Sequence, residues 1–293
     1  MGQSHDTIVD APRVAFDEEG DNGLVICDRY VPPELLGEIF CRAHLRTLLN
    51  CQLVCKRWRT VIQSYVWRKK TELVLGKPFP RQAEEIPWQV FYLTCKRRPF
   101  ERNLLRNHSG GQKMKHWEIL SNGGDSWRVE VPPAGVLELP LTEPIFGGKQ
   151  VCFATSYHNC TKRQTVNLLA KGFHPYVLDV LQPPIEVSEW YSCRWDCPAM
   201  YECEIELLGL ENDQKTKKVL DKFQFRDTLE GDKQNKWLHI SHVFKNYGHG
   251  LREISFLHGG MDNSFWAGHY GSKMAGACIS IKFPPATTHI YGE

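Results

Sequence analysis

The chain has 293 residues, of which 42% are hydrophobic, 24% charged and 11% aromatic, and its formal net charge is +2. This profile is typical of a globular protein with two domains, and it excludes a collagen-like or wholly disordered chain. No stretch of 18 residues lacks a charged side chain, so no transmembrane helix and no stable membrane insertion are predicted. The near-neutral charge also argues against nucleic acid as a partner.

Residues 1–23 are strongly acidic. Six acidic residues and one basic residue, Arg13, give this stretch a net charge of −5 and leave +7 on the rest of the chain. Few apolar residues accompany the charges, so the composition predicts a disordered acidic tail.

A small helical domain is predicted over residues 24–72. Pro32 and Pro33 suit the start of a helix, where a missing amide donor costs nothing. Three short apolar stripes follow at helical spacing, over 35–40, 45–49 and 54–62. Three short helices make a core too small to fold alone, so we expect a partner or a neighbouring domain to complete it.

Residues 73–98 are predicted to form a helical linker, in which 88–93 has a helical pattern after three prolines. A basic run surrounds its end, and we interpret it as a solvent-facing cluster. Its members are Lys96, Arg97, Arg98, Arg102 and Arg106.

The pattern changes to strands in the domain predicted over 99–285. A hairpin is predicted for 117–130, because two apolar stretches flank the turn sequence Asn-Gly-Gly-Asp. Further strands are expected over 152–157, 201–208, 238–244, 251–257 and 278–283, whereas 161–182 suggests short helices and 211–236 a long loop. Many short strands separated by Gly and Pro turns predict an antiparallel, jelly-roll-like β-sandwich. The whole chain is thus of α+β multidomain class, with a C-terminal tail at 286–293.

The chain has eleven cysteines, an odd number without a tight framework. With no secretory signal at the start, we expect reduced thiols and a cytoplasmic location. No paired zinc knuckles occur, so no metal and no other cofactor is predicted.

Two sets of motifs resemble a known family. Residues 31–40 read VPPELLGEIF, 48–59 read LLNCQLVCKRWR and 66–68 read VWR, which together resemble an F-box. The stretches RNLLRN at 102–107, NGGDSW at 122–127, FATSY at 153–157, HGG at 258–260 and FWAG at 265–268 resemble the F-box-associated domain of the sugar-recognising F-box-only subfamily. The two resemblances cover about residues 28–285.

The resemblance implies a non-catalytic substrate receptor of an SCF (Skp–cullin–F-box) ubiquitin ligase. The F-box would bind the Skp-type adaptor and, through it, the cullin-RING ligase, while the sandwich would hold the substrate. Candidate adaptor-contact or core residues are Leu35, Leu36, Ile39, Leu48, Leu49, Val54 and Trp58. Sequence alone does not separate the two roles.

The resemblance further implies binding of the inner chitobiose of high-mannose N-linked glycans, and so a role in glycoprotein and ER-associated degradation. The positions that match the family's sugar-binding loops are Tyr157, Asp196, Phe265, Trp266 and Ala267. An aromatic ring can cover the apolar face of a sugar, and a carboxylate can accept hydrogen bonds from its hydroxyls.

Two of these positions depart from the sugar-binding relatives. Ala267 stands where some relatives carry Lys, and Phe265 replaces the commoner Tyr, so an ammonium and a hydroxyl are lost. We expect weaker sugar binding or a narrower choice of glycan. Two alternatives stay open: an F-box receptor that recognises a protein surface without a glycan, and a free carbohydrate-binding chaperone. Independent catalysis is not predicted, since no hydrolase, metalloprotease or phosphate-loop motif occurs.

Overall fold

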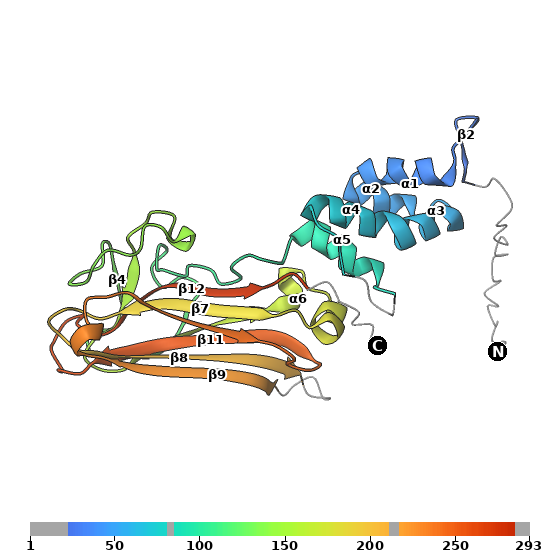
Figure 1. The fold of residues 1–293 in the computed structure, drawn as a ribbon. Coiled ribbons are helices and arrows are strands. Elements are labelled where there is room, and N and C mark those ends of the chain that lie inside the picture. The colour runs from blue at the N-terminus through green and yellow to red at the C-terminus, as the bar shows by residue number, and fades with distance from the viewer. Residues whose placement is uncertain (1–22, 81–84, 211–216, 285–293) are drawn as a thin grey trace, which may run out of the picture. The chain divides into compact units, whose positions relative to one another are not determined.

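The computed structural model describes residues 23–80, 85–210 and 217–284 (Figure 1). The chain divides into two compact units, Met1–Pro78 and Phe79–Glu293, which we call unit 1 and unit 2. The predicted C-terminal tail and all but the last residue of the predicted acidic tail lie outside the described residues. Within the described part of the chain, no helix is both long enough and apolar enough to span a membrane.

Unit 1 is helical, as predicted. Its elements are β1 (Val25–Ile26), β2 (Arg29–Tyr30), α1 (Pro33–Arg42), α2 (Leu45–Cys51), α3 (Lys56–Val61), η1 (Ile62–Val66) and α4 (Trp67–Leu75). The first two predicted apolar stripes lie on α1 and α2, and the third begins the helical run α3–η1–α4. Gly76 ends this run in the left-handed conformation, with φ of 68°, which favours glycine.

The core of unit 1 joins α1 and α2 to the long helical run. Leu36, Leu48 and Trp67 are fully buried there. Phe40 packs edge-on against Trp58, with 5.0 Å between the ring centroids. The Lys70 ammonium donates hydrogen bonds to two carbonyls at the end of α1, which satisfies groups that the helix leaves unpaired.

Unit 2 is a β-sandwich of two five-stranded sheets in which every pairing is antiparallel, so the predicted fold class is confirmed (Figure 1). One sheet has the order β10-β7-β12-β5-β4, and the other has the order β3-β6-β11-β8-β9. The first sheet comprises β4 (Arg128–Glu130), β5 (Cys152–Ala154), β7 (Ile185–Ser192), β10 (Leu238–Phe244) and β12 (Lys273–Ile281). The second comprises β3 (Glu118–Asn122), β6 (Cys160–Asn167), β8 (Ala199–Leu210), β9 (Lys217–Leu229) and β11 (Leu251–Asp262). The helical segments of unit 2 are α5 (Trp88–Arg97), η2 (Pro144–Phe146), α6 (Leu168–Lys171), η3 (Val177–Leu181) and η4 (Gly231–Lys233).

The predicted hairpin over 117–130 is wrong, because β3 pairs with β6 in one sheet whereas β4 pairs with β5 in the other. The turn between them crosses from sheet to sheet. A Cβ on Gly123 would lie 2.7 Å from Cβ of His158, and one on Gly124 would lie 2.6 Å from Oγ of Ser156. The glycines are therefore needed for close packing against the β5–β6 loop.

Two further expectations are corrected. The predicted loop over 211–236 contains the thirteen-residue strand β9, which a charged outer face conceals in the sequence. Its outward Lys222 and Arg226 alternate with Phe223 and Phe225 on the inner face. The predicted helices over 161–182 begin only at Leu168, since the first part of that range is strand β6.

The interior of the sandwich contains ionisable side chains from both sheets. Lys162 is fully buried on β6, and its Nζ lies 3.4 Å from the ring centroid of Trp127 and 3.5 Å from that of Phe153. His258, directly across from Lys162 on β11, lies 2.7 Å through Nδ1 from a carboxylate oxygen of Glu189 on β7. These contacts connect the two sheets through the packing of Lys162 against aromatic rings and through a short His258–Glu189 hydrogen bond.

A second set of buried polar contacts surrounds the first. The hydroxyl of Tyr201 donates to Glu189 at 2.5 Å. Burial raises the pKa of Glu189 to about 8, and burial together with the nearby Lys162 charge lowers the pKa of His258 well below its usual range. His258 is therefore held neutral in the folded protein.

We predict that His258→Gln destabilises the protein less at low pH than at neutral pH. His258 stays neutral in the folded wild type, whereas the unfolded chain can protonate it. The wild type therefore loses about 1.4 kcal/mol of its free energy of unfolding for each pH unit below about 6.5. The variant lacks that proton uptake, and its deficit in free energy of unfolding should shrink between about pH 7.5 and about pH 5. Urea unfolding of both proteins at the two pH values measures the difference in their free energies of unfolding. The exposed His249→Gln is the control, and a deficit independent of pH would contradict the prediction.

Candidate functional site

Four loops of the sandwich meet at one end, which we call the loop end. They are the β3–β4 loop (123–127), the β5–β6 loop (155–159), the β7–β8 loop (193–198) and the β11–β12 loop (263–272). The strand pairing places them together: Asn122 pairs with Cys160, Ala199 with Asp262, and Lys273 with both Ala154 and Ser192. All five predicted glycan-binding residues lie on three of these loops.

Backbone and hydroxyl hydrogen bonds fix the four loops to one another. The Ser156 hydroxyl accepts from the amide of Asp125 at 2.9 Å and donates to the carbonyl of Gly268 at 2.6 Å. The amide of Asp262 donates to the carbonyl of Ser156, and the amide of Asn263 donates to the carbonyl of Pro198. These hydrogen bonds join the four loops to one another through contacts within the chain.

Aromatic side chains line the loop end. Phe265 is 62% exposed and Trp266 47% exposed, so two neighbouring rings form an exposed apolar surface of the kind that marks interaction sites. His158 lies between Tyr157 and Phe265, with ring centroids 5.0 and 6.0 Å away. Phe265 has φ of 56°, a conformation that only a well-determined loop imposes on a bulky residue, and such outliers gather at functional sites.

The carboxylate of Asp196 is oriented by a two-pronged ion pair. Nε and Nη2 of Arg194 each lie 2.8 Å from one of its oxygens. The hydrogen bonds from this guanidinium hold the pKa of Asp196 below its usual range, so the group is ionised at neutral pH. The same guanidinium stacks on Tyr270, whose ring packs edge-on against Trp266 at 5.5 Å. The β7–β8 and β11–β12 loops are thus connected through side chains.

Two residues of the loop end were not predicted from the sequence. Trp195 is 65% exposed beside Asp196, and its amide donates to the carbonyl of Gly135 at 3.0 Å. His158 is exposed between Tyr157 and Phe265. The only feature of the sequence that could have indicated them is that each adjoins a predicted site residue, Asp196 or Tyr157. Ala267 is exposed in the β11–β12 loop, as a contact position requires.

The seven predicted adaptor residues of unit 1 separate into three groups. Leu35, Ile39 and Val54 are 53%, 48% and 62% exposed, so they can contact a partner. Leu36 and Leu48 are fully buried and belong to the core of unit 1. The remaining two, Leu49 and Trp58, are half-buried, and the Trp58 indole donates to the carbonyl of Gly23 at 2.5 Å.

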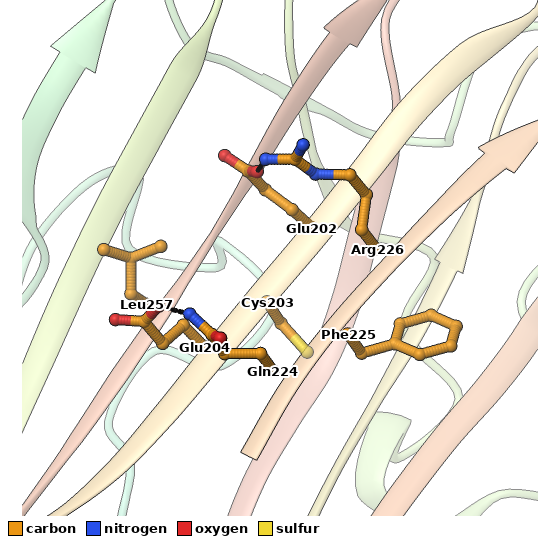
Figure 2. A pocket seen from close by; sticks show the side chains of 7 residues that line it. All are labelled: Glu202, Cys203, Glu204, Gln224, Phe225, Arg226 and Leu257. Atoms are coloured by element: carbon orange, nitrogen blue, oxygen red, sulfur yellow. Dashed lines mark hydrogen bonds and ion pairs between the residues drawn. The ribbon is translucent and has the colours of Figure 1, made fainter. Parts of the chain in front are cut away.

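A separate hollow lies on the outer face of the β3-β6-β11-β8-β9 sheet, and its lining is self-paired. Figure 2 shows that Arg226 donates a hydrogen bond to Glu202, and Gln224 to Glu204, across strands β9 and β8. The Arg226–Glu202 ion pair measures 2.6 Å, and Lys222 also lies 2.9 Å from Glu204. Because its carboxylates are already paired, this hollow is a weaker candidate than the loop end.

Cysteine and histidine form no metal site in the described ranges, where no group of three or more His, Cys, Asp or Glu side chains could hold an ion. All eleven cysteines are free thiols, and only Cys27 is exposed. Burial raises the pKa of Cys193 and of Cys203 to about 12, so neither is a reactive thiolate at neutral pH.

The comparisons with known proteins agree with this division of the chain. The model of the family described as "FBA: F-box associated region" matches residues 95–281, and the one described as "F-box-like" matches residues 29–72. F-box only protein 6 of Rattus norvegicus is 35% identical over 258 residues, which cover 86% of this chain and 85% of that protein. F-box only protein 44 of Homo sapiens is 35% identical over 263 residues, which cover 87% of this chain and 96% of that protein.

Comparison with solved structures gives low similarity scores. The carbohydrate-binding module TmCBM61, solved in complex with β-1,4-galactotriose, has a TM-score of 0.36 at 10% identity, over 62% of this chain and 100% of that one. A family 16 carbohydrate-binding module has a TM-score of 0.37 at 13% identity, over 60% of this chain and 99% of that one. The family assignment rests on the sequence matches: the chain belongs to the F-box-only family, in the group that joins an F-box-like region to an F-box associated region, the architecture of SCF substrate receptors.

Proposed function

We propose that the loop end binds the chitobiose core of high-mannose N-linked glycans, and that unit 1 binds a Skp-type adaptor. The chain then delivers glycoproteins to a cullin-RING ubiquitin ligase. The observation that carries the proposal is the exposed pair Phe265 and Trp266. Trp266 is connected to the oriented carboxylate of Asp196 by successive contacts through Tyr270 and Arg194.

The chemistry of a sugar ring fits this arrangement. Its C–H face is apolar and its rim carries hydroxyls, so it needs a flat apolar surface beside a hydrogen-bond acceptor. Trp266 offers the surface, and Asp196 keeps acceptor capacity after each of its oxygens has taken one bond from Arg194. Tyr157, His158 and Phe265 lie next to one another and would offer a second sugar ring a further aromatic surface.

Preorganisation supports binding at this place. The Ser156 hydrogen bonds and the Arg194–Tyr270 stack hold the loops through contacts within the chain, none of which needs a ligand. A site that needs little ordering loses less entropy when it binds, so a modest contact area can give useful affinity. The missing ammonium at Ala267 and the missing hydroxyl at Phe265 reduce the number of hydrogen bonds that the site can make.

The exposed apolar residues of unit 1 suit an adaptor helix. Leu35 and Ile39 lie one turn apart on α1, and Leu53 and Val54 are 74% and 62% exposed after α2. A helical partner that covers these side chains would complete a small core, as amphipathic helices do in hydrophobic grooves. The ligase role is then one of placement, because binding raises the effective concentration of substrate lysines near the charged ubiquitin.

A cytoplasmic receptor of glycans needs glycoproteins that have left the secretory pathway. We therefore propose that its substrates are glycoproteins exported for degradation, the ER-associated route. The chain itself supplies no reacting group to this process, since the conjugating enzyme and the ligase complex carry the chemistry.

Recognition of a protein surface without a glycan is the second candidate. Trp195 favours it, because a tryptophan that is 65% exposed beside the site can anchor a polypeptide as well as a sugar. Ala267 favours it too, since an alanine offers a sugar no hydrogen bond from its side chain.

Trp266→Ala should weaken retention of a high-mannose glycoprotein by at least about tenfold, because the apolar face of the sugar loses its stacking surface. Immobilised full-length chain and a glycoprotein such as ribonuclease B give the measurement. The exposed Leu141→Ala serves as a matched control and should bind like the wild type.

Enzymatic removal of the glycan tests the same proposal from the ligand side. Retention by the wild type should disappear with the sugar. Retention that survives deglycosylation, or that is unchanged in Trp266→Ala, would overturn the glycan proposal and favour recognition of the protein surface.

Ala267→Lys should raise the affinity for free chitobiose by about fivefold, because the ammonium adds a charge-assisted hydrogen bond worth about 1 kcal/mol. Isothermal titration with the disaccharide measures the change. Ala267→Met, which adds length without charge, is the control, and equal affinities for all three proteins would contradict the expectation.

The double variant Leu35→Glu/Ile39→Glu should lose association with a Skp-type adaptor, because two carboxylates would be buried at the interface without partners. Both residues are surface-exposed, so circular dichroism should show an intact fold. Val180→Glu, a change at an exposed apolar residue of unit 2, should leave adaptor capture unchanged. Undiminished capture by the double variant would place the adaptor elsewhere.

A further inference from the structure

Basic side chains from three separate segments gather at the end of the sandwich opposite the loop end. Strand β6 begins at Cys160 beside the glycan-site loops and ends at Asn167, where α6 follows and leads to Lys171. There Lys171 meets residues that precede β3, about seventy positions earlier in the chain. We call the following residues the basic cluster: Arg97, Arg102, Arg106, Lys115, His116 and Lys171.

Specific contacts hold the basic cluster together. Nη2 of Arg102 donates to the carbonyl of Lys171 at 3.3 Å, and the Lys171 ammonium donates to the carbonyl of Leu104 at 2.7 Å. Gly172 leaves room for Arg97, whose side chain would collide with a Cβ at that position. The backbone of Arg106 exchanges two hydrogen bonds with the side chain of Gln164 on β6. The positions of these cations are therefore set by the fold.

Like charges crowd one another in the cluster. Burial and the charges of Arg106 and Arg102 lower the pKa of Lys171. Partial desolvation and the charges of Arg106, Lys115 and Lys171 likewise lower the pKa of His116. Crowded like charges weaken a fold, so their presence calls for an explanation.

Elsewhere in unit 2, exposed basic side chains form ion pairs with carboxylates. On the outer face of the β3-β6-β11-β8-β9 sheet, Arg163 pairs with Glu118, Arg226 with Glu202 and Lys217 with Glu253. The arginines and lysines of the basic cluster make no ion pair with any carboxylate in the described ranges. Their pairing capacity is thus left for a partner.

The chemistry of the cluster suits anions that accept two parallel hydrogen bonds, as carboxylates do. Arg97, Arg102 and Arg106 are exposed, and a guanidinium binds a carboxylate through two parallel hydrogen bonds. Single-stranded nucleic acid would need exposed aromatic rings for its bases to stack upon, and apart from the His116 imidazole the cluster has none.

We propose that the basic cluster is a docking surface for an acidic peptide segment of a partner protein. The segment would lie across Arg97, Arg102 and Arg106, with Lys171 at the centre. Since the cluster and the loop end lie at opposite ends of β6, an acidic segment and a glycan can bind at the same time. The proposal is independent of the glycan site.

The test uses the full-length chain and a fluorescein-labelled peptide of about ten Asp and Glu residues. Fluorescence anisotropy at about 50 mM salt should show binding that weakens steeply as salt rises, because exposed charges are screened. Arg102→Glu/Arg106→Glu should weaken it by at least about tenfold. Lys236→Glu/Lys245→Glu has the same net charge at exposed positions outside the cluster, and it should bind like the wild type.

Equal weakening by both double variants would overturn the proposal, since net charge alone would then explain the binding. Tighter binding of single-stranded DNA or of phosphatidylserine vesicles, lost in the same Arg102/Arg106 variant, would overturn it in favour of those ligands. Should charge reversal disturb the fold, Arg102→Gln/Arg106→Gln and Lys171→Gln remove charge alone and should still weaken peptide binding severalfold. Trp266→Ala should leave it unchanged.

Discussion

The sandwich depends on Lys162, a fully buried lysine whose Nζ has no hydrogen-bond partner among the described residues. The Nζ faces the rings of Trp127 and Phe153. Burial lowers the pKa of Lys162 well below its usual range, and the nearby Glu189 opposes that shift. A shift of one residue in the pairing of β6 would move Lys162 to the solvent face and leave Glu189 without it. The ionisable core therefore selects one register for both sheets.

That register also sets the positions of the loop end and the basic cluster. Cys160, two residues before Lys162, closes the β5–β6 loop that carries Tyr157, whereas Asn167, five residues after it, leads to Lys171. One strand thus fixes the distance between the aromatic loop end and the basic cluster. A rigid frame with separate ends suits a receptor that must hold one partner while it contacts another.

The sequence predicted much of this molecule where local patterns carry the signal. The helices of unit 1 follow from apolar stripes, and the strands β8, β10 and β11 follow from alternation. The loop positions Phe265 and Trp266 came from motif resemblance, and the structure shows both exposed. Strand β9 was missed because its outward Lys222, Gln224 and Arg226 gave the segment the composition of a loop.

Other features were out of reach because they depend on contacts between distant residues. Gly123 and Gly124 have the pattern of a hairpin turn. Glycine is needed there because Ser156 and His158 lie too close to leave room for a Cβ. The exposed cations at the end of α5 and after it have the pattern of an ordinary solvated cluster, and nothing local indicates that Lys171 joins them. The ion pair on Asp196 and the burial of Leu36 and Leu48 are likewise tertiary facts.

The distribution of the thiols has a practical consequence. Ten of the eleven cysteines are shielded to some degree, and Cys27, at the turn between β1 and β2 with φ of 51°, is the one that is exposed. A maleimide dye should therefore attach there first, on unit 1, and leave the sandwich unmodified. The native sequence already contains a labelling position for following the helical unit in a larger assembly, with no engineered cysteine.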